Sequence, residues 1–175
     1  MVTPCDVLFG SNVKGHTVAS QGTPATALLA RENVTHRLHP YEVDPDTTNY
    51  GAAVADTLGI AQERVFKTLV TTIDGALTVA VVPVTGDVDL KALASAVGGK
   101  RAALADRGLA EKTTGYLRGG ISPLGQRRKL PTVIDASAST HPTVYVSAGR
   151  RGLQVELDPS DLQQLTGATL ARIAG

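Results

Sequence analysis

The sequence is poor in cysteine and in aromatic residues. Among its 175 residues there are one cysteine, no tryptophan, four tyrosines and two phenylalanines. The single cysteine, Cys5, excludes an internal disulfide and a zinc site built from several thiolates. So few rings also argue against a protein that binds nucleic acid by stacking successive bases on aromatic side chains.

Long apolar runs are missing as well. No stretch reaches the roughly 18 to 20 apolar residues that a membrane span needs, and the N-terminus lacks the continuous apolar core of a secretory signal. We therefore expect a soluble, cytoplasmic protein that does not contact a membrane. Hydrophobic residues make up 42% of the chain and charged residues 19%, a balance typical of a folded domain.

The chain is predicted to consist of a leader and one domain. Residues 1–22 show no sustained helical or strand period, and we interpret them as a flexible leader or an expression remnant. Residues 23–175 form the domain. Cys5 falls in the leader, where a catalytic nucleophile would be poorly held.

The pattern within the domain predicts short helices and a larger number of strands. The clearest signal is a hairpin, residues 65–73 and 77–83, joined by Asp74-Gly75, a dipeptide suited to a type I′ turn. Helices are expected at 25–32, 52–58, 90–97, 107–112 and from 159 onward, and further strands at 36–41, 102–105, 132–135, 143–147 and 153–157. This order predicts an α+β domain with a curved, mixed sheet.

Positive charge is concentrated in one segment of a nearly neutral chain. Residues 112–151 contain seven lysines and arginines and one acid, Asp135, for a net charge of +6, which leaves −5 for the rest. Such a segment favours a phosphate-bearing ligand and salt-sensitive binding. The alternative is a set of scattered, solvated surface charges.

The usual catalytic motifs are absent. The four histidines do not have zinc-site spacing, and neither a G-x-S-x-G elbow nor a phosphate-binding glycine motif occurs. We expect neither a metal nor a cofactor. The glycine-rich loop 119–125 could offer backbone N–H groups to a developing oxyanion, or could be no more than a tight turn. Lys67 lies within an apolar strand, where a lone lysine is usually an edge or solvent residue.

Several of these segments together resemble a known family. The runs Phe66-Lys67-Thr68-Leu69, Thr114-Gly115-Tyr116-Leu117 and Gly119-Gly120-Ile121-Ser122-Pro123-Leu124-Gly125 are similar to motifs of the YbaK/EbsC family of cysteinyl-tRNA(Pro) deacylases. Shorter matches are Thr23-Pro24-Ala25, His39 with Tyr41, Asp44-Pro45, Tyr50-Gly51, Tyr145-Val146-Ser147 and Arg151-Gly152-Leu153. The resemblance covers residues 23–167, and the order of the motifs makes it specific.

The resemblance implies a fold and an activity. The fold would be that of the editing domain of bacterial prolyl-tRNA synthetase, a mixed sheet curled into a barrel with helices around it. The activity would be removal of cysteine wrongly attached to proline tRNA, with the acceptor end of that tRNA and prolyl-tRNA synthetase as partners. The cysteine thiol of the substrate would attack its own ester, so that the protein supplies position and oxyanion stabilisation.

The resemblance also implies the site residues. Lys67 would contact the phosphate or sugar of the terminal adenosine, and Gly119 and Gly120 would offer backbone donors to the oxyanion. The substrate pocket would be formed by Tyr41, Tyr50, Thr68, Tyr116, Ser122 and Ser147. The sequence departs from some relatives at Tyr50, where they carry Phe, and at Asp135, where they carry Asn.

Three alternatives stay open at this point. The enzyme could act on another small amino acid such as alanine, or it could use an activated water in place of the substrate thiol. A noncatalytic module that binds tRNA or the synthetase would carry the same basic segment.

Overall fold

The computed structural model describes residues 22–175, so the expectation of a leader at residues 1–22 falls outside the described residues except at its last position. The α-helices are α2 (Pro24–Arg31), α3 (Tyr50–Leu58), α4 (Leu90–Ala96), α5 (Arg107–Thr114) and α6 (Pro159–Thr166), and short 3-10 helices lie at Gln62–Arg64 and Ala136–Thr140. The strands are β1 (His36–Pro40), β2 (Phe66–Ile73), β3 (Ala76–Pro83), β4 (Ala102–Leu104), β5 (Thr132–Asp135), β6 (Val144–Arg150), β7 (Leu153–Leu157) and β8 (Thr169–Ala171).

Helix boundaries follow capping residues in the sequence. Thr23 caps α2 by accepting a hydrogen bond from the N–H of Thr26, and Pro24 occupies the first turn. The Thr23 hydroxyl also donates to the carbonyl of Ala148 at 2.5 Å, which ties α2 to β6. Asp106 caps α5 in the same manner through the N–H of Leu109. These starts agree with the predicted ones within one residue.

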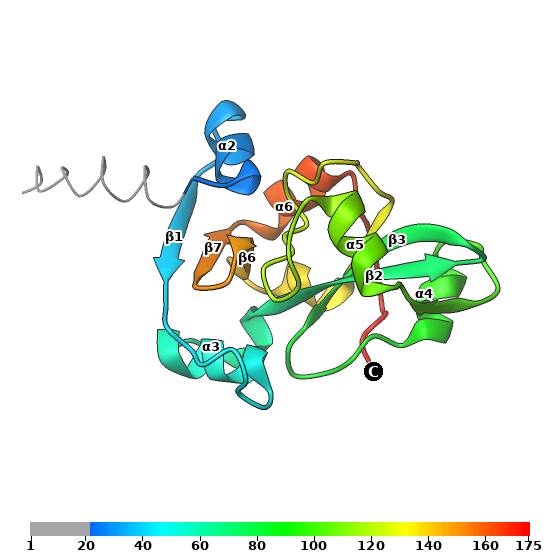
Figure 1. The fold of residues 1–175 in the computed structure, drawn as a ribbon, viewed down its shortest axis with the longest axis horizontal. Coiled ribbons are helices and arrows are strands. Elements are labelled where there is room, and N and C mark those ends of the chain that lie inside the picture. Colours follow the sequence, from blue (N-terminus) through cyan, green and yellow to red (C-terminus); the bar gives the residue numbers. More distant parts are fainter. Residues whose placement is uncertain (1–21) are drawn as a thin grey trace, which may run out of the picture.

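The strands form two sheets. β1, β7 and β6 make an antiparallel sheet in the order β1-β7-β6, and the other five strands pair in the order β4-β2-β3-β5-β8. In Figure 1 the smaller sheet lies with α2 and α3 on one side of the molecule, and the β2–β3 hairpin extends toward α4 on the other. The predicted α+β class is confirmed.

The predicted hairpin is also confirmed. β2 and β3 pair antiparallel over their whole length, from Phe66 opposite Pro83 to Ile73 opposite Ala76. The turn residues Asp74 and Gly75 have φ values of 50° and 88°, as a type I′ turn requires. β3 pairs with β5 on its other side in parallel fashion, which makes it the central strand.

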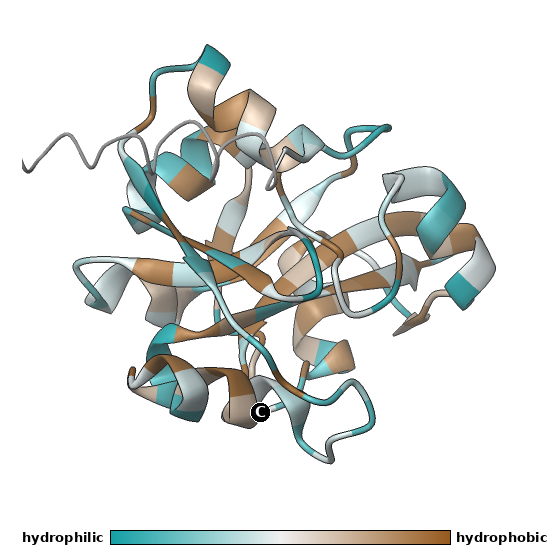
Figure 2. Ribbon diagram, turned by 60° about the vertical axis from the view of Figure 1, so that its left-hand side comes forward, coloured by the Kyte–Doolittle hydropathy of each residue, from teal (hydrophilic) through white to brown (hydrophobic). Residues whose placement is uncertain are grey.

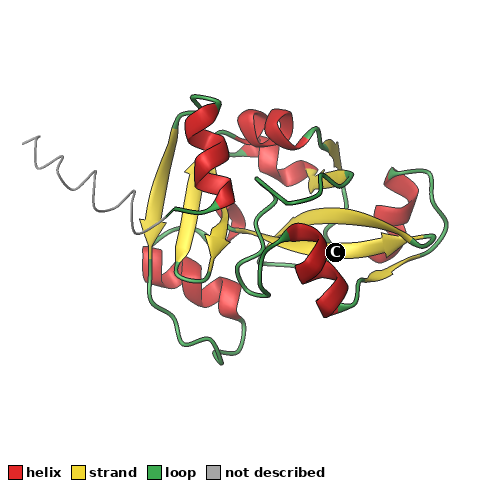
Figure 3. Ribbon diagram, turned by 45° about the horizontal axis from the view of Figure 1, so that its top comes forward, coloured by secondary structure: helices red, strands yellow, loops and turns green. Residues whose placement is uncertain are grey.

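The expected single sheet, curled into a barrel, is wrong. Among the described residues, the ladder between the two sheets is reduced to one isolated parallel bridge between Val65 and Tyr145, so no closed ring of hydrogen bonds forms. Figure 3 shows the strands as two separate groups. The short strand β8, which follows α6 and pairs parallel with β5, was not predicted.

The core occupies both faces of the larger sheet. Val79 and Val81 of β3 point into the main cluster, which the smaller sheet, α2 and α6 complete, whereas Ala80 and Val82 face α4 and the chain end at Ile173. This burial on both faces explains the unbroken apolar run of β3. The hydropathy colouring in Figure 2 shows apolar strand segments inside and polar turns outside.

Within residues 22–175, none of the helices has the length and apolar character needed to cross a membrane.

Candidate active site

A cavity of about 880 Å³ lies where the two sheets meet. Its walls come from the loop before α3, from β2, α5 and the glycine-rich loop, and from one residue each of β6 and β7. Five residues that the sequence predicted for the site line it: Tyr50, Lys67, Thr68, Gly119 and Ser147. The cavity therefore joins the lysine to the glycine turn, although they lie more than fifty positions apart in the chain.

The other four predicted site residues lie outside this lining. Tyr41 is buried and shares a 3.1 Å hydrogen bond with the hydroxyl of Tyr50. Tyr116 and Ser122 are buried within the glycine-rich segment, where the Tyr116 hydroxyl donates to the carbonyl of Leu124 at 2.6 Å and Ser122 accepts from the Leu124 N–H. Gly120 donates its N–H to the carbonyl of Leu117 at 2.9 Å. These groups give the loop its shape.

Lys67 is paired in this structure. Its Nζ donates a 2.7 Å hydrogen bond to Oδ1 of Asp87, which follows β3 and whose side chain is 91% exposed. The hydrogen bond and the charge of Lys67 hold the pKa of Asp87 below its ordinary value. Asp87 itself is fixed through its backbone, because its N–H and carbonyl both bond to Gly175.

Tyr50 forms a small aromatic and cationic group at the wall of the cavity. Its ring lies edge-on to that of Tyr41, and the guanidinium of Arg151 lies over it at 5.4 Å from the ring centre. Burial and the hydrogen bond with Tyr41 raise the pKa of Tyr50, so its phenol is neutral at physiological pH. The group thus offers hydroxyls and one fixed cation to the cavity.

The glycine turn approaches the next loop closely. Gly119 has a φ of 87°, and a Cβ there would collide with the Arg151 guanidinium. A Cβ on Gly120 would lie 2.7 Å from the Cα of Arg150. Both positions therefore require glycine, the first for its backbone conformation as well as for space. Among the described residues, the N–H of Gly119 has no backbone acceptor.

Two arginines at the cavity have no acidic partner among the described residues. Arg107 pairs with Glu111 at 3.6 Å, but Arg118 and Arg151 form no ion pair. Arg151 is held instead by carbonyl groups, that of Pro45 at 3.3 Å and that of Arg118 at 3.4 Å. Both arginines belong to the basic segment predicted from the sequence, which brings part of its charge to this cavity.

Two residues of the cavity lining carry buried, unpaired polar atoms. In the described part of the chain, two buried side-chain oxygens make no hydrogen bond: Oγ1 of Thr68 and Oε1 of Gln154. Both residues line the cavity. Leaving such an atom unpaired costs roughly 1 to 3 kcal/mol, so two of them at one place indicate a ligand. Gln154 was missed in the sequence, although it directly follows the Arg151-Gly152-Leu153 motif.

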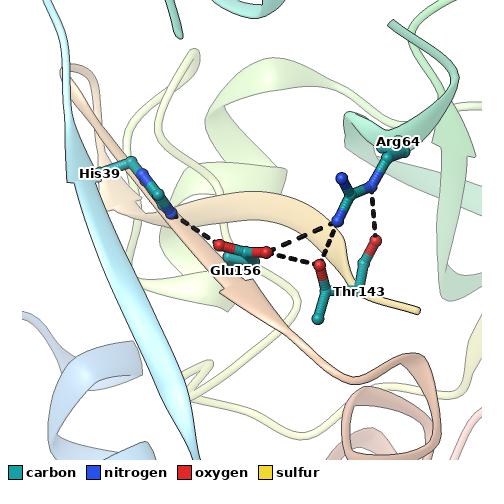
Figure 4. Close-up of polar contacts among 4 residues, drawn as sticks. All are labelled: His39, Arg64, Thr143 and Glu156. Atoms are coloured by element: carbon teal, nitrogen blue, oxygen red, sulfur yellow. Dashed lines mark hydrogen bonds and ion pairs between the residues drawn. The ribbon is translucent and has the colours of Figure 1, made fainter. Parts of the chain in front are cut away.

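A partly buried polar cluster extends from the same face of the smaller sheet. Glu156, two residues after Gln154 on β7, accepts hydrogen bonds from His39 at 2.9 Å and from Thr143 at 2.5 Å, and pairs with Arg64 at 3.5 Å (Figure 4). Burial alone would raise the pKa of Glu156, but the hydrogen bonds from Thr143 and His39 outweigh it and lower this pKa below its ordinary value. The cluster fixes the strand that presents Gln154.

Neither the cluster nor the cavity forms a metal centre. Within residues 22–175, no group of three or more histidine, cysteine, aspartate or glutamate side chains is arranged to hold a metal ion. A second cavity, of about 830 Å³ between α2 and α6, lies apart from Lys67, Thr68 and Tyr50.

Comparisons with known proteins agree with this geometry. A family model described as an aminoacyl-tRNA editing domain matches residues 44–165. The protein EbsC of Enterococcus faecalis, named as a candidate Cys-tRNA(Pro)/Cys-tRNA(Cys) deacylase, is 38% identical over 156 residues, which cover 87% of this chain and 93% of that protein.

Solved structures show the same fold. A candidate trans-editing enzyme for prolyl-tRNA synthetase superposes with a TM-score of 0.71 at 20% identity, covering 100% of this chain and 99% of that one. A hypothetical protein superposes with a TM-score of 0.77 at 24% identity, covering 87% of this chain and 100% of that one.

The chain belongs to the aminoacyl-tRNA editing domain family. The resemblance to the YbaK/EbsC family is confirmed, and so is the class of enzyme that it implied, an aminoacyl-tRNA deacylase.

Proposed function

We propose that this protein is a trans-editing deacylase that removes cysteine from mischarged tRNA(Pro). The observation that carries the proposal is the cavity that brings Lys67, Thr68 and Gly119 together beside Arg118 and Arg151, which have no acidic partner within residues 22–175. The name of the relative from E. faecalis, with 38% identity, supports cysteine as the amino acid.

Lys67 and the arginines suit the acceptor end of a tRNA. An ammonium and two guanidinium groups provide the charge that phosphate oxygens require. In the proposal Lys67 leaves Asp87 and binds the phosphate or ribose of the terminal adenosine. Arg118 and Arg151 hold the preceding phosphate backbone, so binding weakens as salt rises.

The substrate is proposed to supply its own nucleophile. Among the described residues, the cavity lining contains neither cysteine nor histidine. In the proposed step the cysteine sulfur attacks its own ester carbon, a C–S bond forms and the C–O bond to the ribose breaks. The thiol proton passes to the departing ribose oxygen, and the product is a four-membered thiolactone that water then opens.

The protein contributes position and a donor to this step. In the proposal the N–H of Gly119 stabilises the oxyanion, whereas the N–H of Gly120 is already bonded to the carbonyl of Leu117 and serves the turn. Tyr50, Thr68 and Ser147 form walls of the pocket, with Tyr41 behind Tyr50. Accurate positioning suffices because an aminoacyl ester is already activated.

A panel of charged tRNAs tests the proposal. Purified protein is incubated with tRNA(Pro) carrying cysteine, serine or alanine, and release of each amino acid is followed. Cysteine should be released much faster than serine, which has the same shape but a far weaker nucleophile. Equal rates would point to an activated water, preference for alanine to a different substrate, and no release of any amino acid to a noncatalytic module.

Prolyl-tRNA synthetase is the proposed protein partner. In the proposal, selection of tRNA(Pro) comes from a complex with that synthetase. A pull-down at two ionic strengths tests this, with retention at low salt and loss at high salt as the expected result. Absence of the synthetase at both strengths would remove it as a partner.

A further inference from the structure

The two unpaired oxygens of the cavity come from different sheets. Thr68 lies on β2. Gln154 is the second residue of β7 and lies opposite Ser147 of β6 on one side and His39 of β1 on the other. Gln154 is only 7% exposed, so its amide cannot turn freely into water. Both residues belong to the lining of the cavity that holds Lys67 and Gly119, and both oxygens are buried without a hydrogen-bond partner in the described part of the chain.

These two oxygens are hydrogen-bond acceptors, whereas the charged groups and the glycine N–H of the site are donors. Lys67, Arg118, Arg151 and the Gly119 N–H are donors, which match the phosphate and carbonyl oxygens of an aminoacyl ester. An amide oxygen is a neutral acceptor, and a hydroxyl oxygen can also accept. The one group near the ester that offers only donors, when protonated, is the α-amino group of the amino acid.

We propose, on the basis of the proposed function, that Gln154 and Thr68 bind the α-amino group of the aminoacyl moiety. The free amine is then a determinant of substrate choice, and an ester whose amine is missing or acylated is rejected because the two oxygens stay unpaired.

The carboxylates of the lining are poorly suited to this task. Glu111 already accepts the N–H of Arg118 at 2.7 Å and pairs with Arg107. Asp46 is exposed at the rim, where water screens its charge. Gln154 and Thr68 are lining residues whose acceptor oxygens make no other hydrogen bond in the described part of the chain.

A substrate that lacks only the amine provides the test. The desamino analogue of cysteinyl-tRNA(Pro), a 3-mercaptopropionyl ester, keeps the thiol, the carbonyl and the tRNA. Each enzymatic kcat/KM is divided by the uncatalysed rate for the same ester, so that intrinsic reactivity cancels. The wild-type protein should prefer the cysteinyl ester by about tenfold or more, the effect of losing a buried hydrogen bond.

Variants assign the preference to the residue. Gln154→Leu should lose about tenfold on the cysteinyl ester and change little on the desamino ester, so that the preference falls toward one. Gln154→Glu keeps an acceptor and should keep the preference. Gln164→Leu, at an exposed glutamine of α6, is the matched control and should behave as wild type.

The outcomes separate this inference from the proposed function. If the wild type cleaves both esters equally well, or if Gln154→Leu slows both equally, recognition of the amine is refuted while the deacylase activity stands. If the wild type cleaves neither ester, the proposed function fails and the inference fails with it. The wild-type comparison holds even if Gln154→Leu does not fold.

Discussion

The Nζ of Lys67 lies 2.7 Å from the carboxylate of Asp87, so the cation at the cavity is neutralised by an exposed counter-ion. Because the Asp87 side chain is 91% exposed, water screens this pair and limits its strength. A phosphate can therefore replace the carboxylate at modest cost.

Replacing Lys67 should abolish activity without unfolding the protein. Lys67→Ala removes the proposed anchor of the terminal adenosine, and we expect deacylation of cysteinyl-tRNA to fall by about a hundredfold or more, a typical loss for a charged contact made in the transition state. Initial rates measure this, with circular dichroism to check the fold. Lys91→Ala, on an exposed residue of α4, is the control. Full activity of Lys67→Ala would exclude the lysine from the mechanism.

Removing the counter-ion should have the opposite effect on binding. In Asp87→Asn the carboxylate no longer competes with a phosphate for the ammonium of Lys67. Adenosine monophosphate should therefore bind about two- to fivefold more tightly, the range expected for loss of an exposed ion pair. Isothermal titration at low salt measures this. In the Lys67→Ala background the same change should have little effect, and an equal gain there would show that Asp87 acts only through general charge.

The arginines without acidic partners should govern the salt dependence of tRNA binding. Arg118→Gln and Arg151→Gln should each weaken binding and lower the slope of log K against log salt by about 0.7 to 1, if each contacts one phosphate. Fluorescence anisotropy at several salt concentrations provides the slopes. Arg172→Gln, at an exposed residue outside the cavity lining, should leave the slope unchanged. Slopes that stay equal to wild type would place the tRNA backbone elsewhere.

The close approach of Gly120 to the next loop predicts a loss of stability. In Gly120→Ala the new methyl group would lie 2.7 Å from backbone Cα of Arg150, and relieving this overlap should cost about 1 to 3 kcal/mol of unfolding free energy. Urea denaturation measures it. Gly59→Ala, at a position with φ of 68° and open space, should show only backbone strain of about 1 kcal/mol. A Gly120→Ala protein as stable as wild type would mean that the two loops separate easily.

The Glu156 cluster should make stability depend on acidity. Because the folded protein lowers the pKa of Glu156 below 4.5, ionised Glu156 stabilises the fold above that pH, and the contribution is lost as the pH falls through the lowered pKa. At pH 7, Glu156→Gln should reduce the unfolding free energy by about 1 to 3 kcal/mol, the usual value for hydrogen bonds to a charged group. Urea titrations at several pH values should show this difference shrinking below pH 4.5. If the difference in unfolding free energy between the two proteins stayed constant with pH, the charge of Glu156 would not contribute to stability.

Local structure was predictable where a few adjacent residues decide it. Asp74-Gly75 specifies the hairpin turn, and Thr23-Pro24 specifies the start of α2. The division into two sheets was not predictable, because it depends on which strands pair over long sequence separations. Even the one bridge between the sheets joins Val65 to Tyr145, eighty positions further along the chain. The short β8 likewise depends on its pairing with β5.

Motifs in the sequence predicted part of the candidate site, and the structure was needed for the rest. Lys67, Thr68 and Gly119 belong to recognisable runs, and all three reach the cavity. Tyr116 and Ser122 belong to such a run too, but their side chains are buried in the loop, which sequence position alone does not reveal. Gln154, in contrast, lies outside the motifs but lines the cavity. Strand alternation puts it on one face with Glu156, but only the packing of the sheets shows which face meets the cavity.

The backbone N–H and carbonyl of Asp87 both bond to Gly175, so the loop that carries this carboxylate stays in place when Lys67 leaves it. Exchange of the lysine between its internal anion and an incoming phosphate is then a rotation of one side chain. Such rotations take picoseconds to nanoseconds, far less time than a loop rearrangement. Turnover of this enzyme should accordingly be limited by bond cleavage or tRNA departure, and the entrance to the pocket needs no gate.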